Sequence, residues 1–126
     1  MTKNKNYQLG LLYMVHLLVS SDGEITDLER NALDIIRKNE NIPDDLFETF
    51  RKHVASKKEK EIYQAGIDYL NQCSDGDKLE AFAHLYRISE ADGNVHVKEV
   101  RLLLYSIRLI GIDFNDVVDY AKKHKS

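Results

Sequence analysis

Four acidic residues form the clearest chemical pattern in this sequence. Asp22 and Glu29 begin and end a stretch that reads Asp-Gly-x-[Ile/Val]-x-x-x-Glu, and Asp92 and Glu99 begin and end a second stretch of the same kind. The two copies are 70 residues apart, since 92 − 22 and 99 − 29 give the same offset. In each copy the aspartate ends one apolar run and the glutamate lies near the start of the next. The sequence therefore predicts one unit of two helices and a turn, present twice, with two carboxylates flanking each turn.

Carboxylate oxygens in this number suit a hard divalent cation. A set of oxygen ligands favours Mg²⁺, Ca²⁺ or Mn²⁺ over Zn²⁺. Asp22 and Asp92 each follow a helix, where a carboxylate meets the negative end of the helix dipole at a cost of about 0.3–1 kcal/mol. A nearby positive charge would offset this cost. A divalent cation held by Asp22, Glu29, Asp92 and Glu99 is one candidate for this charge.

A different interpretation needs no metal. Glu29 is the third helical residue after Thr26, so the two side chains can form a capping box. Arg30 and Arg101 could pair with the aspartates and offset the helix dipole. In this alternative the four acids are only helix caps and ion-pair struts, and the protein is a non-enzymatic helical module that binds another protein.

Two more specific metal sites fit the pattern less well. The motif matches positions five to twelve of an EF-hand loop, but position one would be Leu18 or Ile88, which offer no oxygen ligand. His96 and Glu99 form an i, i+3 pair of the kind found in carboxylate-bridged iron sites. The first copy has Thr26 in place of His96, which argues against a paired iron site.

Composition indicates one compact domain spanning residues 1–126. A chain of 126 residues with 43% hydrophobic content can bury one core and is short for two. The net charge of −3, from 18 basic and 21 acidic residues, argues against nucleic acid as a partner. No phosphate-binding glycine loop, His-Glu-x-x-His zinc pattern or Gly-x-Ser-x-Gly nucleophile turn is present, so we expect no enzymatic activity.

The single cysteine and the two histidines in apolar helices do not suggest a further metal site. Cys73 is the only cysteine, which excludes a disulfide framework and a cysteine-rich zinc site, and we expect it to be buried. His16 and His84 lie in apolar helices, where a histidine is more often a core residue than a ligand.

The N-terminal apolar run could be confused with a secretion signal. Lys3 and Lys5 precede the run from Leu9 to Val19, which is the order of a signal peptide. A similar segment at 79–88 lies in the middle of the chain and cannot be a leader, and the first run is too short to span a bilayer. We therefore expect a core helix, no membrane insertion and a cytoplasmic protein.

The spacing of apolar residues predicts an all-α fold. The sequence has one proline, six glycines and no useful alternating stretch. Seven helices are predicted, at about residues 6–21, 27–39, 43–54, 58–73, 77–91, 97–110 and from 114 onward. We expect two repeated halves, at about 9–54 and 79–123, joined by the fourth helix.

Apolar stripes predict which helix faces point inward. In the second helix these residues are Leu28, Ala32, Leu33, Ile35 and Ile36. In the sixth helix they are Val100, Leu103, Leu104, Ile107 and Ile110. Four tyrosines are interpreted as packing residues, namely Tyr63, Tyr69, Tyr86 and Tyr105.

The two turns, at 20–29 and 90–99, and the sequence Leu-Ile-Gly-Ile at 109–112 resemble those of the TerB-like family. These small helical domains are named for a tellurite-resistance protein and also occur in a DnaJ-like co-chaperone. The resemblance covers roughly Leu9 to Ala121. It implies a helical fold, chelation of a divalent cation by the paired acids, and a link to tellurite and stress resistance. We also expect a protein partner, which the sequence does not identify. The co-chaperone role does not carry over, because the chain has no J-domain pattern.

The relative direction of the first and fifth helices decides whether the acids form one site. An antiparallel pair would place Asp22 and Asp92 about 20–25 Å apart, given a rise of 1.5 Å per residue. A parallel or steeply crossed pair would gather all four carboxylates, whose mutual repulsion would call for a cation. We expect the gathered arrangement, because one shared cation explains both unfavourably placed aspartates.

Overall fold

The computed structural model describes residues 5–19, 27–91 and 97–123, with backbone alone at 19, 28–29, 89–91, 97–100 and 102–103. Every regular element in these ranges is a helix, which confirms the all-α fold. Within the same ranges, no helix combines the length and apolar character needed to cross a membrane. The helices are α1 (Lys5–Val19), α2 (Asp27–Glu40), α3 (Asp44–Ser56), α4 (Glu59–Asn71), α5 (Asp75–Ala91), α6 (Val97–Ile110) and α7 (Phe114–Lys123).

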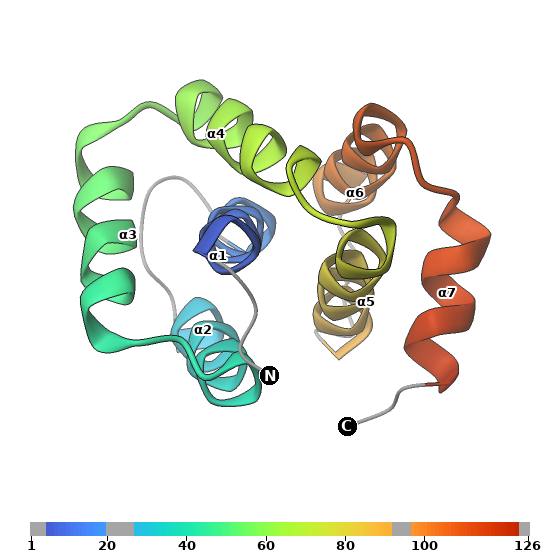
Figure 1. The fold of residues 1–126 in the computed structure, drawn as a ribbon, viewed down its shortest axis with the longest axis horizontal. Helices are drawn as coiled ribbons and strands as arrows, with labels where there is room; N and C mark the ends of the chain where they lie inside the picture. The colour runs from blue at the N-terminus through green and yellow to red at the C-terminus, as the bar shows by residue number, and fades with distance from the viewer. Residues whose placement is uncertain (1–4, 20–26, 92–96, 124–126) are drawn as a thin grey trace.

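Helix α1 is the centre of the fold. Its sequence is apolar around most of its circumference, so it can be stabilised only by neighbours on several sides. It contacts α2, α3, α4, α5 and α6, and Figure 1 shows it enclosed by α2, α3 and α4 on one side and α5 on the other. Fully buried side chains of α1 include Tyr7, Leu11, Leu12 and Val15.

Helix α4 packs closely against α1, through two glycines. A Cβ atom added to Gly10 would lie 2.8 Å from Cγ of Leu70, and one added to Gly66 would lie 3.1 Å from the sulfur of Met14. The absence of side chains at Gly10 and Gly66 lets the two backbones approach. Helix α4 also contacts α6, so it links the first three helices to the last three.

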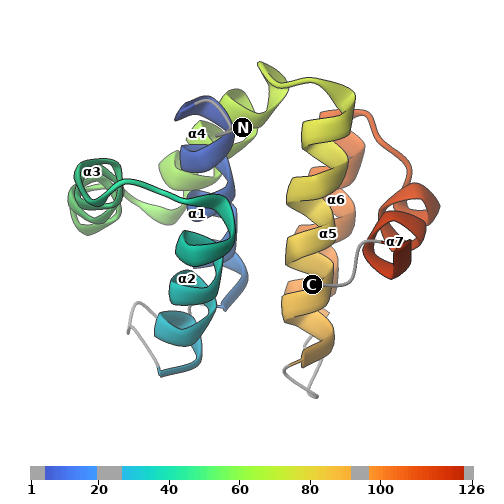
Figure 2. The same cartoon turned by 60° about the horizontal axis from the view of Figure 1, so that its bottom comes forward.

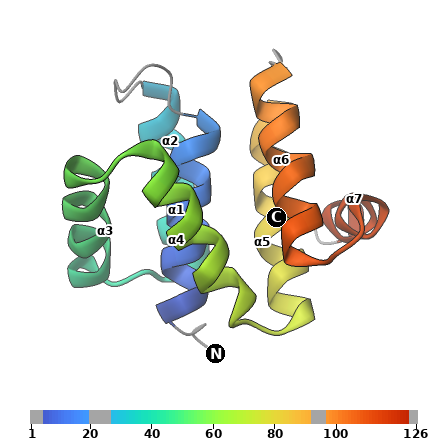
Figure 3. The ribbon, with the colours of Figure 1, turned by 90° about the horizontal axis from the view of Figure 1, so that it is seen from above.

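Helices α1 and α5 lie side by side and run in the same direction. They are in contact, and two views show both helices starting at one end of the molecule and finishing at the other (Figures 2 and 3). The last turns of α1 and α5 and the first turns of α2 and α6 therefore lie at the same end (Figure 3). The antiparallel alternative for these two helices is wrong.

Helices α2 and α6 end in the same way. The residue after α2 is Asn41, with φ of 52°, and the residue after α6 is Gly111, with φ of 85°. The next amide, of Ile42 or Ile112, donates to the carbonyl five residues earlier, at 3.1 Å or 3.3 Å. This is the Schellman arrangement, in which a residue in the left-handed region stops the helix.

Three predicted inward residues lie at the surface instead. Ile35 is 57% exposed, Leu104 is 46% exposed and Tyr105 is 62% exposed. The buried stripe of α2 contains Ala32, Leu33, Ile36 and Glu40, and that of α6 contains Ser106, Ile107 and Ile110. Each stripe is narrower than the apolar sequence pattern, so these three residues fall outside it. Cys73 is buried, as predicted.

Candidate metal centres

The four predicted ligands lie at or beyond the edge of the described residues. Asp22 and Asp92 fall outside them. Glu29 is the third residue of α2 and Glu99 is the third residue of α6, but only their backbones are described. The ends of the helices that flank both turns lie at the same end of the molecule (Figure 2). The site itself stays a prediction, as do the capping and ion-pair alternatives.

A second group of possible ligands lies inside the described core. One ligand atom each from Glu40, Glu80 and His84 can be chosen so that all three lie within 4.8 Å of one another. Glu80 and His84 are four residues apart on α5 and therefore share one helix face. Glu40 is the last residue of α2. The group thus joins α2 to α5 and could hold a metal ion.

The carboxylate of Glu40 occupies an unusual position. The residue is 8% exposed and lies at the negative end of the α2 dipole, which disfavours a charge there. At the same offset as the two turns (110 − 40 = 70), α6 ends in the buried Ile110. The end of α2 therefore carries a carboxylate where the end of α6 carries an apolar side chain, and this buried carboxylate needs a positive partner.

Glu40 is held from two sides. Its carboxylate Oε1 lies 3.1 Å from Nε2 of His84, with side chains that are 7% and 10% exposed. Its backbone carbonyl accepts a hydrogen bond of 3.1 Å from the side-chain amide of Gln8 in α1, which is also buried. Three helices therefore fix its position.

Tyr7 of α1 lies close to the same group. Burial raises the pKa of its hydroxyl far above the ordinary range, and the charges of Glu40, Glu80 and Asp77 raise this pKa further. The hydroxyl therefore stays protonated at neutral pH. It lies close enough to Glu40 and Glu80 for their charges to act on it.

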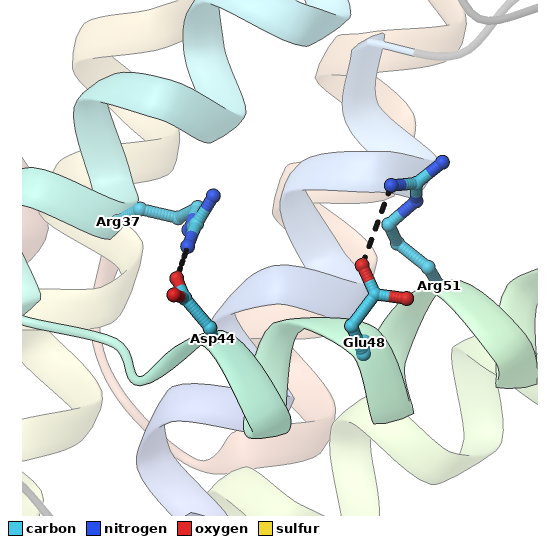
Figure 4. Close-up of polar contacts among 4 residues, drawn as sticks. All are labelled: Arg37, Asp44, Glu48 and Arg51. Carbon is cyan, nitrogen blue, oxygen red and sulfur yellow. Dashed lines mark hydrogen bonds and ion pairs between the residues drawn. The ribbon is translucent and has the colours of Figure 1, made fainter.

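The turn that follows Glu40 is braced by Arg37. Figure 4 shows its side chain reaching from α2 to the carboxylate of Asp44, with which it forms a hydrogen-bonded ion pair. The same guanidinium lies 4.3 Å from the ring centroid of Phe47. These contacts bind the last turn of α2 to α3. The other pair in Figure 4, Glu48 with Arg51 at 3.4 Å, is exposed and lies within α3.

Sequence reasoning did not find the Glu40, Glu80 and His84 group. His84 was correctly predicted to be buried, but its carboxylate neighbour was not predicted. Two signals were available. Glu80 and His84 have the i, i+4 spacing that places two ligands on one helix face. Glu40 falls where the other half of the chain has isoleucine.

A family model described as Tellurite resistance protein TerB matches residues 8–122, which is nearly the whole chain. No curated protein and no solved structure matches the chain.

Proposed function

The chain belongs to the TerB family, and on this premise we propose that it is a non-enzymatic domain that binds one hard divalent cation through Asp22, Glu29, Asp92 and Glu99. The family supports an association with tellurite resistance. The observation that carries the proposal is the parallel course of α1 and α5, which brings the ends of the helices that flank both turns to one end of the molecule (Figure 2).

The positions of the four acids relative to the helix dipoles favour a bound cation. Two aspartates follow the C-terminal ends of α1 and α5, where the helix dipoles disfavour negative charge. Two glutamates lie in the first turns of α2 and α6, where the dipoles favour it. A divalent ion offsets the aspartates and bridges all four carboxylates. Oxygen ligands select Mg²⁺, Ca²⁺ or Mn²⁺.

Isothermal titration with Mg²⁺, Ca²⁺ and Mn²⁺ tests this function. The wild-type protein should bind one Mg²⁺ or Ca²⁺ ion at the turns, and Asp22→Asn or Asp92→Asn should each weaken this binding by at least about tenfold, because each removes one charged ligand. Asp34→Asn is the matched control, since Asp34 is an exposed aspartate of α2. No heat from the wild-type protein at millimolar ion would reject the proposal.

A second candidate function, binding of a partner protein, is favoured by the exposed face of α6. Leu104, Tyr105 and Leu109 are 46%, 62% and 50% exposed. Tyr105 also lines a surface hollow of about 590 Å³ together with Leu17, Glu59, Lys60, Tyr63 and Arg101. Apolar side chains beside Lys60 and Arg101 fit a partner segment that carries both apolar and acidic residues.

A growth assay separates the two functions. In cells that depend on this protein for tellurite resistance, Leu104→Ser with Tyr105→Ser should lower resistance if α6 binds a partner. The variant should keep the melting temperature and cation affinity of the wild-type protein, because both residues are exposed. Unchanged resistance would remove the interaction face from consideration.

A further inference from the structure

We propose that Glu40, Glu80 and His84 form a second, buried metal site, which takes a first-row transition ion of the Zn²⁺ class. The site is separate from the two acidic turns and does not depend on them. Its residues come from the last turn of α2 and from the first three turns of α5, all inside the described core.

The distances within the group suit one ion. The three ligand atoms already lie within 4.8 Å of one another. Two ligand atoms that each lie about 2.0–2.2 Å from one ion are about 3–4 Å apart. Side-chain rotations that move the ligand atoms by roughly 1 Å would therefore complete the site. Glu80 and His84 approach from one helix face and Glu40 from another helix. Three protein ligands leave a fourth position for water in a tetrahedral site.

The balance of charge in the group favours a divalent ion. With a protonated imidazole, two carboxylates and one cation leave a net negative charge among largely buried side chains. With a neutral imidazole, a divalent ion makes the group of Glu40, Glu80 and His84 neutral overall. Two carboxylates among largely buried side chains are costly, and the two positive charges of a divalent ion lower this cost.

The ligand types separate this site from the turns. An imidazole nitrogen suits Zn²⁺, Fe²⁺ and Co²⁺, whereas Mg²⁺ and Ca²⁺ prefer oxygen alone. In known metal sites, hydrogen bonds from outer groups hold the ligands in place. Here the side-chain amide of Gln8 donates to the backbone carbonyl of Glu40 and so holds this residue at the end of α2.

The test uses the full chain, stripped of metal with a chelator and then titrated with Zn²⁺ and Co²⁺. Zn²⁺ binding is followed by calorimetry, and Co²⁺ binding by the visible absorption that reports nitrogen and oxygen coordination. We expect one equivalent of Zn²⁺ or of Co²⁺ to bind, and we expect Zn²⁺ to displace bound Co²⁺ from the same site. Glu80→Gln and His84→Gln should each weaken Zn²⁺ binding by at least about 100-fold, more than the loss of an outer hydrogen bond.

Two controls make the result specific. Glu61→Gln changes an exposed glutamate of α4 and should leave the affinity for Zn²⁺ within about twofold. Asp22→Asn with Asp92→Asn should also leave it unchanged, so the failure of this site and of the proposed function at the turns can be told apart.

Two results would overturn the inference. One is a wild-type protein that binds no Zn²⁺, and the other is Zn²⁺ affinity that survives Glu80→Gln. Glu80 is only partly buried and glutamine keeps its shape, so this variant decides the question if His84→Gln does not fold. Circular dichroism in the presence of chelator establishes which variants are folded.

Discussion

At the scale of single residues, Gln8 has a role that its type alone does not reveal. Its side chain is 3% exposed, and its amide donates to the carbonyl of Glu40 at 3.1 Å. The last carbonyl groups of a helix have no partner within the helix. A side chain from α1 therefore supplies one of the missing donors at the end of α2 and fixes the residue that carries the buried carboxylate.

The variant Gln8→Met tests this role while keeping the side-chain volume. It leaves the buried carbonyl without its donor, and we expect a loss of about 1–3 kcal/mol in the free energy of unfolding, measured in urea. The control is Gln64→Met, because Gln64 is exposed and its amide donates to Asp68 on the same helix. That change should stay within about 0.5 kcal/mol. Equal effects of both variants would contradict the assigned role.

Candidate site residues could be identified from the sequence where a pattern repeats along the chain. They were harder to identify where the residues meet only through tertiary packing. The four turn acids stand out because they recur at one offset. Gln8, Glu40 and His84 meet only because α1, α2 and α5 pack together. Local sequence gives no direct sign of such a meeting, so His84 was predicted to be buried without its partner.

At the scale of helices, the contact between α1 and α4 depends on two small residues. Gly10 and Gly66 face the opposite helix, and a Cβ atom at Gly10 would lie 2.8 Å from Cγ and 3.0 Å from Cδ2 of Leu70. Leu70 is fully buried, so it has little room to move. This packing sets how closely α4 covers the central helix.

The variant Gly10→Ala should therefore destabilise the fold. Overpacking of a filled core typically costs about 1–3 kcal/mol, which exceeds the gain in helix propensity of about 1 kcal/mol. Gly76→Ala is the control, because the nearest atom to its added Cβ would be 4.0 Å away in the exposed first turn of α5. Thermal unfolding should show a lower melting temperature for the first variant and an equal or higher one for the second. A higher melting temperature for Gly10→Ala than for Gly76→Ala would show that the contact between α1 and α4 can accommodate the added methyl group without loss of stability.

Helix existence was predictable from apolar spacing, and helix ends from capping residues. Gly111 follows the end of α6, as is typical of a glycine in the left-handed region, whereas α2 runs to Glu40, one residue past its predicted end, and is stopped by Asn41. Inward faces were less predictable, because the width of a buried stripe depends on how many neighbours the helix has. The α6 stripe excludes Leu104 and Tyr105, which sequence alone placed inside.

At the scale of the whole molecule, two buried tyrosines link the stability of the fold to alkaline pH. Burial, followed by the neighbouring Tyr69, raises the pKa of Tyr13 to about 12, from an ordinary value of 10.0. Burial also raises the pKa of Tyr7. Tyr13 is enclosed by the rings of Phe50 and Tyr69, and its hydroxyl is hydrogen-bonded to His53.

Stability should therefore fall as pH rises from about 10 towards about 12. In this window the unfolded chain releases phenol protons that the folded protein retains, so the folded state is progressively disfavoured. Urea unfolding at several pH values measures the slope. Tyr13→Phe should reduce the slope, whereas Tyr105→Phe should not, because Tyr105 is 62% exposed. The same slope in all three proteins would contradict the link.

The parallel course of α1 and α5 was one of two arrangements that the sequence left open. Apolar spacing shows that both helices are buried but carries no information on their relative direction. That direction follows from the path of α2, α3 and α4 between them, which returns the chain to the starting end of α1 before α5 begins (Figure 2). The central claim, a cation shared by both turns, depends on this arrangement.

Nuclear magnetic resonance with Mn²⁺ tests the shared site most directly. Isotope-labelled Glu80→Gln protein is titrated with Mn²⁺, so that the buried group does not compete for the ion. The account predicts that the amide signals of Gly23 and Gly93 broaden together, at the same Mn²⁺ concentration, while that of Gly76 at the other end of α5 stays sharp. Broadening of one turn without the other, or of neither, would contradict a single cation held by Asp22, Glu29, Asp92 and Glu99.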